Sequence, residues 1–162
     1  MDDLFKKAGG LIKSFKDGLS GFNAVDLTDV ISDIEECNVY GRNIFTEKDC
    51  EETILKHLRS KSGYNNVHQQ YSIGGNLALK IDMDIDERIG IEIKLAEQLK
   101  DSASNAQRLL GQLLYYSKRK YQSNIIVLVI GPSKLKNDPL IKELNTFIEE
   151  DLNLTFLYKN FK

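Results

Sequence analysis

The chain of 162 residues has no apolar segment long enough to cross a membrane and no large excess of charge of either sign. Its longest uninterrupted apolar run is Ile125–Ile130, whereas a transmembrane helix needs roughly 20 such residues. No apolar core follows the first lysines, so we expect no secretory signal. The formal net charge of −2 excludes a strongly basic protein that coats nucleic acid, but permits an enzyme with a local basic surface. We therefore expect a cytoplasmic protein without a transmembrane segment.

Cysteines and the common catalytic motifs are also scarce. Cys37 and Cys50 are too few for a four-ligand zinc site, and we expect both to be reduced thiols. His57 and His68 stand alone in the sequence, where packing or surface positions are the expected roles. There is no glycine-rich phosphate loop, no Ser-His-Asp arrangement and no Cys-His pair. The length suits a single domain.

Residues 1–43 are predicted to form a helical extension. Apolar residues recur there at about helical spacing with lysines between them, although Gly9-Gly10 weakens the pattern; they are Leu4, Phe5, Leu11, Ile12 and Phe15. A second helix is predicted from Asp26 to Glu36. Such a segment packs on its own domain or on a second copy, and contact with a membrane surface stays open. Because so many apolar side chains need cover, we expect the extension to help build a homodimer.

Residues 44–162 are predicted to form one α/β domain that begins with a helix, a three-stranded meander, a helix and a strand, and ends with a further helix and strand. Thr46 is a suitable cap for the first helix. The continuously apolar segment 124–131 is typical of a strand buried on both faces. The predicted helices are 46–60, 102–120 and 139–150, and the predicted strands are 68–73, 77–86, 89–96, 124–131 and 154–158.

Charged residues on the second and third strands are the strongest functional signal. Asp82 is predicted on one strand and Glu92 and Lys94 on the next, so a hairpin brings their side chains together. Two carboxylates with a backbone carbonyl are ligands that Mg²⁺ accepts, and a lysine beside them can hold a water or a phosphate oxygen. The alternative is a plain salt bridge between Lys94 and either carboxylate. Asp84 and Asp86 are expected to be solvated surface.

These residues resemble the pattern of the PD-(D/E)XK nuclease superfamily, which has the restriction-endonuclease-like fold. The family places an Asp on the second strand and Glu-x-Lys on the third, and Asp82, Glu92 and Lys94 match it, with Ile81 where the family often has proline. The similarity extends from the first helix to the fourth strand. It implies a deoxyribonuclease that uses Mg²⁺, with Mn²⁺ as a substitute. Asp82, Glu92 and the Ile93 carbonyl would hold the metal.

The helix after the third strand carries a second match. Gln112 and Tyr116 are four residues apart and Arg108 lies one turn earlier, so we expect these side chains to share a helix face away from the leucine stripe. Gln-x-x-x-Tyr after Glu-x-Lys is similar to the pattern of recombination-helicase nuclease domains, which implies that Gln112 and Tyr116 support catalysis. Residues expected to contact DNA phosphates are Arg108, Lys118, Arg119 and Lys120.

Some superfamily members add a glutamate from the first helix, for which Glu47, Glu51 and Glu52 are candidates. Glu51 is preferred because it shares a helix face with the apolar residues. Two other functions stay open. One is a non-catalytic nucleic-acid-binding or assembly subunit of the same fold, held by a partner protein in a larger DNA-processing complex. The other is an assembly protein that acts through residues 1–43. The residues do not distinguish DNA from RNA, or single from double strands.

Overall fold

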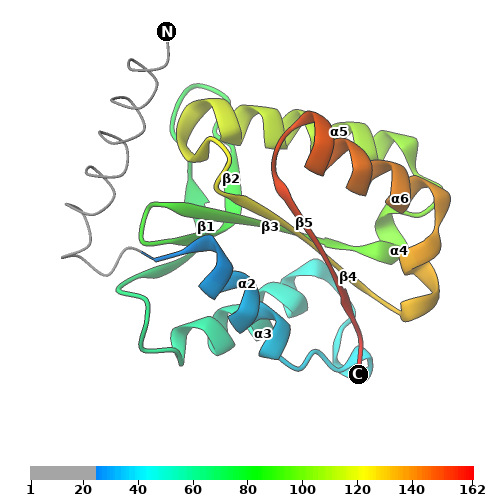
Figure 1. Ribbon diagram of the computed structural model, residues 1–162, viewed down its shortest axis with the longest axis horizontal. Coiled ribbons are helices and arrows are strands. Elements are labelled where there is room, and N and C mark those ends of the chain that lie inside the picture. The colour runs from blue at the N-terminus through cyan, green and yellow to red at the C-terminus, as the bar shows by residue number, and fades with distance from the viewer. Residues whose placement is uncertain (1–24) are drawn as a thin grey trace, which may run out of the picture.

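The computed structural model describes residues 25–162, which form a five-stranded sheet with helices on both faces (Figure 1). The strands follow one another in the order β1-β2-β3-β4-β5; the first three are antiparallel, and the last two join in parallel. Their bounds are β1 Val67–Ser72, β2 Lys80–Ile85, β3 Ile89–Leu95, β4 Ile125–Gly131 and β5 Thr155–Asn160. The predicted α/β class is confirmed.

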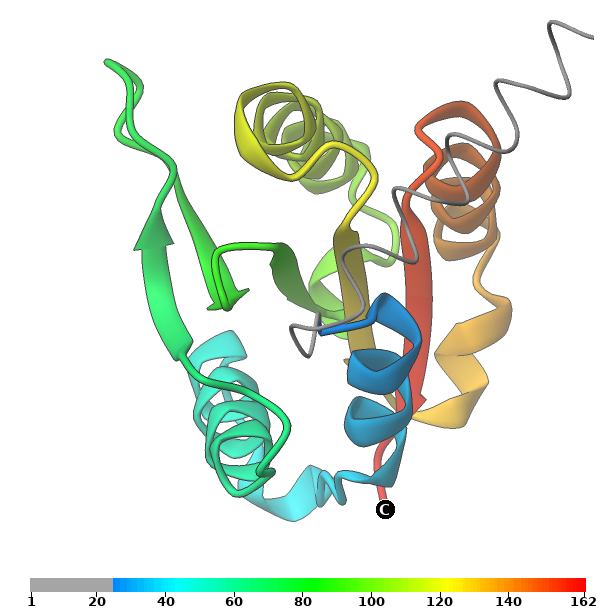
Figure 2. The ribbon, with the colours of Figure 1, turned by 60° about the vertical axis from the view of Figure 1, so that its left-hand side comes forward.

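One face of the sheet carries α2 and α3, and the other carries α5 and α6 (Figure 2). The α-helices are α2 Leu27–Glu36, α3 Glu47–Arg59, α4 Ala96–Leu99, α5 Ala103–Tyr116 and α6 Pro139–Thr146. Shorter helical segments are η1 Gly41–Asn43, η2 Ser117–Tyr121, η3 Ser133–Asn137 and η4 Phe147–Asp151. Within residues 25–162, none of the helices has the length and apolar character that a membrane span requires.

The sheet separates two apolar cores, and β4 supplies both of them. Ile126, Leu128 and Ile130 face α2 and α3 in the first core. The alternate residues of β4 face α5 and α6 in the second core. This alternation explains why the whole strand is apolar, because each of its faces is covered.

The predicted helix starts are confirmed by their caps. Asp26 accepts a hydrogen bond from the Thr28 N–H at the start of α2. Thr46 and Asp49 form a reciprocal capping box at the start of α3. These local hydrogen bonds satisfy backbone donors that a helix start leaves unpaired, so short sequence patterns were enough to predict them.

The described part of the N-terminal extension packs on its own domain. Val30 and Ile34 of α2 are fully buried in the first core beside α3 and the sheet. The earlier apolar residues, from Leu4 to Phe22, lie outside the described residues. The division at residue 43 and the homodimer therefore stay predictions.

Two features of β2 differ from the sequence prediction. The strand begins at Lys80 and not at Leu77, whose side chain is 65% exposed in the connection from β1. The predicted strict alternation is also wrong, because Ile81 packs in the second core whereas Met83 packs in the first. The strand is thus irregular around Asp82.

The ladder pairing explains this irregularity. The β1–β2 ladder joins Gln69 to Met83 and Tyr71 to Ile81 but makes no pair at the positions between them, where Gln70 has a φ of 51°. The β2–β3 ladder likewise runs no further than Met83, which faces Ile91. Beyond that point the β1–β2 hairpin turns away from the other strands, as Figure 2 shows.

The prediction that Asp84 and Asp86 are solvated surface is wrong for Asp84. Its carboxylate is fully buried and accepts hydrogen bonds from the Tyr121 hydroxyl at 2.5 Å and the Glu87 N–H at 2.9 Å. Asp86 is half-buried and accepts a hydrogen bond from the backbone of Asn66. The helical segment η2 covers the face of β2 on which Asp84 lies. A polar side chain buried there needs hydrogen-bond partners within the protein, which Tyr121 and Glu87 provide.

Candidate functional site

Asp82 and Glu92 lie where β2 separates from β3, a place we call the fork. They occupy the first positions beyond the last ladder pair of these strands. The Ile93 N–H donates to Oδ2 of Asp82 at 2.7 Å, so this carboxylate takes the place of a strand partner. The residues are only 9% and 2% exposed, respectively. The fork therefore holds two buried carboxylates that the sequence predicted would meet.

The ammonium group of Lys94 lies among oxygen atoms of the fork. Its Nζ is 2.9 Å from Oε1 of Glu92 and 3.0 Å from the carbonyl oxygen of Ile93. Its distances to carboxylate oxygens of Glu47 and Asp82 are 3.6 Å and 4.0 Å. Lys94 thus lies beside both carboxylates, as predicted for a metal site, and it also makes the salt bridge to Glu92 that the alternative expects.

Three carboxyl groups surround the one ammonium group at the fork. Burial raises the pKa of Glu92 to about 8, with a further contribution from the charge of Asp82. Burial also raises the pKa of Asp82 to about 6, although Lys94 opposes the change. Burial by itself would lower the pKa of Lys94, but the charges of Glu92 and Asp82 outweigh it and the pKa is raised. Because burial is the largest cause of both raised carboxyl pKa values, a cation placed beside Asp82 and Glu92 would lower both.

The oxygen atoms at the fork fit a hard cation such as Mg²⁺. Oε2 of Glu92 and Oε1 of Glu47 are buried and have no hydrogen-bond partner. Across residues 25–162, no three Asp, Glu, His or Cys side chains come close enough to hold an ion by themselves. Two carboxylates and the Ile93 carbonyl are still a set that Mg²⁺ can use, because it keeps several of its waters.

The three candidate glutamates of the first helix have different positions. Glu47 is the one that contacts Lys94 directly. Glu51, the preferred candidate, is buried and reaches Asp82 only through the side chain of Gln70. Glu52 is exposed and pairs with Lys48 on the surface of α3. The sequence does not distinguish them, because the distance from a helix residue to the fork depends on how α3 packs.

Gln70 is a residue of this site that sequence reasoning missed. Its Nε2 donates to Glu51 at 3.0 Å and to Oδ1 of Asp82 at 3.1 Å, so it joins α3 to the fork. Gln69 donates only to Glu51, at 3.1 Å. The two glutamines point to neighbouring groups because Gln70 has a positive φ. No short sequence pattern predicts a bulge at this position.

Gln112 and Arg108 of α5 line a cavity of about 120 Å³ beside the fork. Arg108 is exposed and Gln112 is half-buried. The other residues that line the cavity are Glu47, Lys94, Gln98, Leu99 and Asn105. The structure thus brings these two predicted residues to the predicted lysine, and adds polar groups from α4 and the start of α5.

Tyr116 lies in the second core, so the prediction that its helix face avoids the leucine stripe is wrong for this residue. It is fully buried with Leu109 and Leu113. Its hydroxyl donates to the carbonyl oxygen of Lys80 at 2.8 Å, two residues before Asp82. Burial raises the pKa of this hydroxyl. Tyr116 can position β2 but does not touch the cavity.

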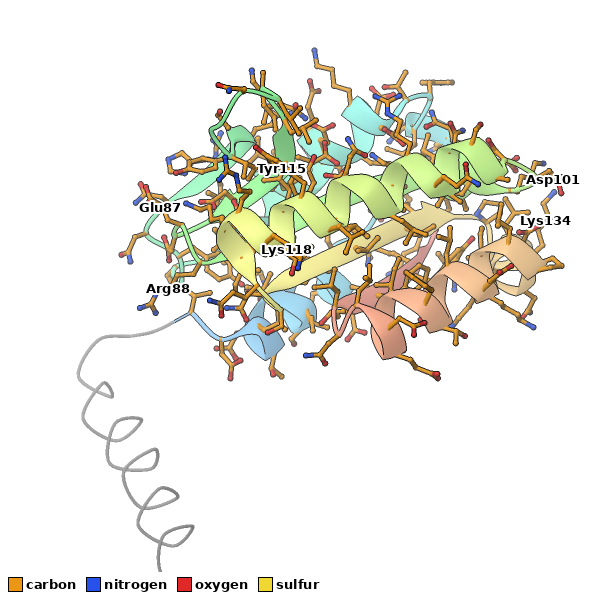
Figure 3. The ribbon with its side chains drawn as sticks, turned by 90° about the horizontal axis from the view of Figure 1, so that it is seen from above. Glu87, Arg88, Asp101, Tyr115, Lys118 and Lys134 are labelled. Atoms are coloured by element: carbon orange, nitrogen blue, oxygen red, sulfur yellow. The ribbon has the colours of Figure 1, made fainter. Side chains whose placement is uncertain are left out.

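The predicted phosphate contacts after α5 lie far from the cavity. Lys118 follows Arg108 by ten residues, which is roughly 15 Å along a helix. Figure 3 shows Lys118 and Tyr115 at one end of this helix and Asp101 near the other. Arg119 lies over the Tyr115 ring at 5.7 Å, and Lys120 lies over a tyrosine of β1. These cations would meet a different part of any nucleic acid than Arg108 does.

Comparisons of this chain with protein-family models, with curated proteins and with solved structures found no match in any of the three. The geometry around Lys94 is therefore the basis on which a function can be proposed.

Proposed function

We propose that this protein is a Mg²⁺-dependent nuclease of the restriction-endonuclease-like kind that hydrolyses phosphodiester bonds in DNA. One observation carries the proposal: a half-buried ammonium group, that of Lys94, lies among the carboxylates of Asp82, Glu92 and Glu47, two of them buried, at a point where two strands separate. Buried charges are costly, and such clusters are typical of functional sites.

Each group at the fork has a role in this proposal. Asp82, Glu92 and the carbonyl of Ile93 would hold the ion. The chemistry that Mg²⁺ supplies is stabilisation of charge on the phosphate and activation of water at neutral pH. Lys94 orients the attacking water and offsets the negative charge that develops on the phosphate. Because these groups are fixed before the substrate arrives, little reorganisation is needed.

The cavity beside the fork suits the phosphate group. Its volume of about 120 Å³ corresponds to about four waters of the liquid, at roughly 30 Å³ each. The guanidinium of Arg108 provides a paired donor for phosphate oxygens, and Gln112 provides an amide donor. These contacts position a phosphate but read no base sequence.

The test is cleavage of supercoiled plasmid and of a labelled single strand, with Mg²⁺, Mn²⁺ or EDTA. We expect at least one of the two substrates to be cleaved with either ion, and neither to be cleaved with EDTA. Asp82→Asn, Glu92→Gln and Lys94→Met should each lower the rate by at least 100-fold, in line with the loss of groups that stabilise a transition state. The matched control is Glu149→Gln, an exposed carboxylate of η4 outside the cavity.

Circular dichroism separates a lost site from a lost fold. A fork variant with the wild-type spectrum and the wild-type rate would remove that residue from the mechanism. Equal cleavage with Mg²⁺ and with EDTA would refute a metal-dependent nuclease, and so would cleavage that all three variants retain.

One observation favours the alternative of a non-catalytic nucleic-acid-binding subunit. Lys94 already contacts the Glu92 carboxylate and the Ile93 carbonyl, so these groups are partly satisfied without an ion. If this alternative holds, wild-type protein binds nucleic acid in EDTA, and Mg²⁺ neither raises its melting temperature nor causes cleavage.

A further inference from the structure

A short segment before α3 exposes two aromatic side chains. Tyr40 is 42% exposed and Phe45 is 82% exposed, the highest value among the large apolar residues that the structure describes. Arg42 lies between them in the chain, with its guanidinium 5.7 Å from the centre of the Tyr40 ring. A single exposed apolar side chain is ordinary on a protein surface, but this segment places two aromatic rings and an arginine within six residues.

The backbone of this segment is held in place by hydrogen bonds at several points. The Gly41 N–H donates to the carbonyl of Lys162, and the Asn43 N–H donates to the carbonyl of Tyr40. The Phe45 N–H donates to Oδ2 of Asp49 at 2.9 Å, inside the capping box of α3. Figure 1 shows the segment beside the C-terminus. Phe45 is therefore presented to solvent by an ordered backbone.

Phe45 does not serve the helix that it precedes. An apolar residue just before the N-cap often packs on the fourth helix residue, here Cys50. Cys50 is fully buried in the first core, while the Phe45 ring stays in solvent. The core therefore gives no reason for a phenylalanine at this position.

The segment leads directly into the candidate site. Phe45 precedes the N-cap Thr46, and the next residue, Glu47, contacts Lys94 and lines the cavity. Two residues of chain span at most about 7 Å. The exposed ring is thus carried by the segment that leads into the cavity-lining start of α3, and Arg42, three residues earlier in the chain, adds a positive charge to the same segment.

We propose that Phe45 stacks on an unpaired nucleobase next to the phosphate in the cavity, so that the substrate is a single strand or a frayed end and not an intact duplex. This inference rests on the proposed nuclease function. Exposed aromatics bind single strands because every unpaired base offers a π face, which base stacking conceals in a duplex. Arg42 contributes attraction to the backbone phosphates.

The chain contains no tryptophan, so Phe45→Trp creates a single fluorescent probe at this position. The full-length variant is titrated in EDTA with a short single-stranded oligonucleotide and with the blunt duplex of the same sequence. We expect saturable quenching of the indole by the single strand, with at least fivefold weaker binding of the duplex. The matched control is Phe147→Trp, at another exposed phenylalanine, on η4, which should show no quenching.

Affinity gives a second readout that does not depend on the probe. Phe45→Ala should weaken binding of the labelled single strand roughly 5- to 150-fold, the range for loss of one aromatic–base stack. Phe45→Tyr should keep the affinity within about twofold, because it keeps the ring. Phe147→Ala should leave it unchanged.

Three results would overturn the inference. They are an unquenched Phe45→Trp, equal quenching by the single strand and the duplex, and an unchanged affinity in Phe45→Ala. If Phe45→Ala instead converts a dimer into a monomer in sedimentation without changing affinity, a second copy covers the ring and the inference is wrong. Quenching without any Mg²⁺-dependent cleavage would support the base contact while refuting the nuclease. Cleavage that needs Asp82 but is unaffected by Phe45→Ala would support the nuclease while refuting the base contact.

Discussion

Glu92 is the side chain that should most affect how stability depends on pH. Burial and the nearby charge of Asp82 raise its pKa from an ordinary value of 4.5 to about 8. A carboxyl whose pKa is raised by folding stabilises the protein only while it stays protonated. That contribution is complete below pH 4.5 and is lost as the pH rises towards 8. Without metal, the protein should therefore be less stable at pH 8 than at pH 5.

We predict that Glu92→Gln removes much of this pH dependence. In EDTA, the free energy of unfolding of wild-type protein should fall between pH 5 and pH 8 by an amount on the order of a few kcal/mol. The variant should show a much smaller fall, because glutamine does not titrate. Urea unfolding at the two pH values measures both proteins. Glu149→Gln serves as the control and should keep the wild-type fall; an equally large fall in Glu92→Gln would contradict the assignment.

Asp84 and Asp82 are only two residues apart, but their carboxylates have different hydrogen-bond and ion-pair partners. The carboxylate of Asp84 is bonded to the Tyr121 hydroxyl and to a turn N–H. Asp82 faces Lys94 and Gln70. Asp84 thus holds the hairpin and η2 together, whereas Asp82 belongs to the fork.

Gln70 lies where the β1–β2 ladder makes no pair, and its side chain connects α3 to the fork. A left-handed φ is unfavourable for glutamine, and here it aims one amide at both Glu51 and Asp82. The strain is located where the proposed metal ligand needs a fixed orientation. Partners of this kind, which hold a ligand from behind, are commonly as sensitive to mutation as some ligands are.

We predict that Gln70→Gly lowers the proposed cleavage rate by about 10- to 100-fold, the usual cost of losing such a partner. Stability should change by less than about 1 kcal/mol, because glycine relieves the strain at a positive φ. Cleavage of the labelled single strand and urea unfolding measure the two effects. Gln69→Ala is the matched control: it removes the neighbouring amide, which contacts Glu51 but not Asp82, and should cost less activity. A larger loss for Gln69→Ala would mean that Glu51, and not Asp82, is the group that must be held.

Considered as one folded unit, the protein includes α2. Ile34 is fully buried against α3 and the sheet, whereas Ile31 on the same helix is only partly buried. The chain of residues 37–46 between α2 and α3 is also attached to the C-terminus through Lys162. Loss of α2 would therefore expose one side of the first core.

We predict that Ile34→Ala lowers the free energy of unfolding by about 2–5 kcal/mol, as truncations of fully buried isoleucines do. Ile31→Ala should lower it by less, because that side chain already meets solvent. Urea unfolding of full-length variants provides the comparison. Equal small losses would show that α2 detaches easily and that the domain proper begins near residue 44.

Local patterns were sufficient for most elements of this fold. The capping box at Thr46, the proline at the start of α6 and the unbroken apolar run of β4 each depend on neighbours in the chain. Capping hydrogen bonds and side-chain periodicity depend on residues that are only a few positions apart, so the sequence predicts them. The pairing of Asp82 with Glu92 and Lys94 was also predictable, because a hairpin brings adjacent strands together.

What only the tertiary structure decided are the contacts between segments that are far apart in the chain. Glu47 and not Glu51 meets Lys94 because of how α3 lies on the sheet. Asp84 is buried because η2 covers its strand. Tyr116 lies in the core because α5 packs with that residue facing the sheet. The irregular position at Gln70 arises where two ladders end. Each depends on the packing of whole elements, which the local hydrogen bonding and periodicity of the sequence do not encode.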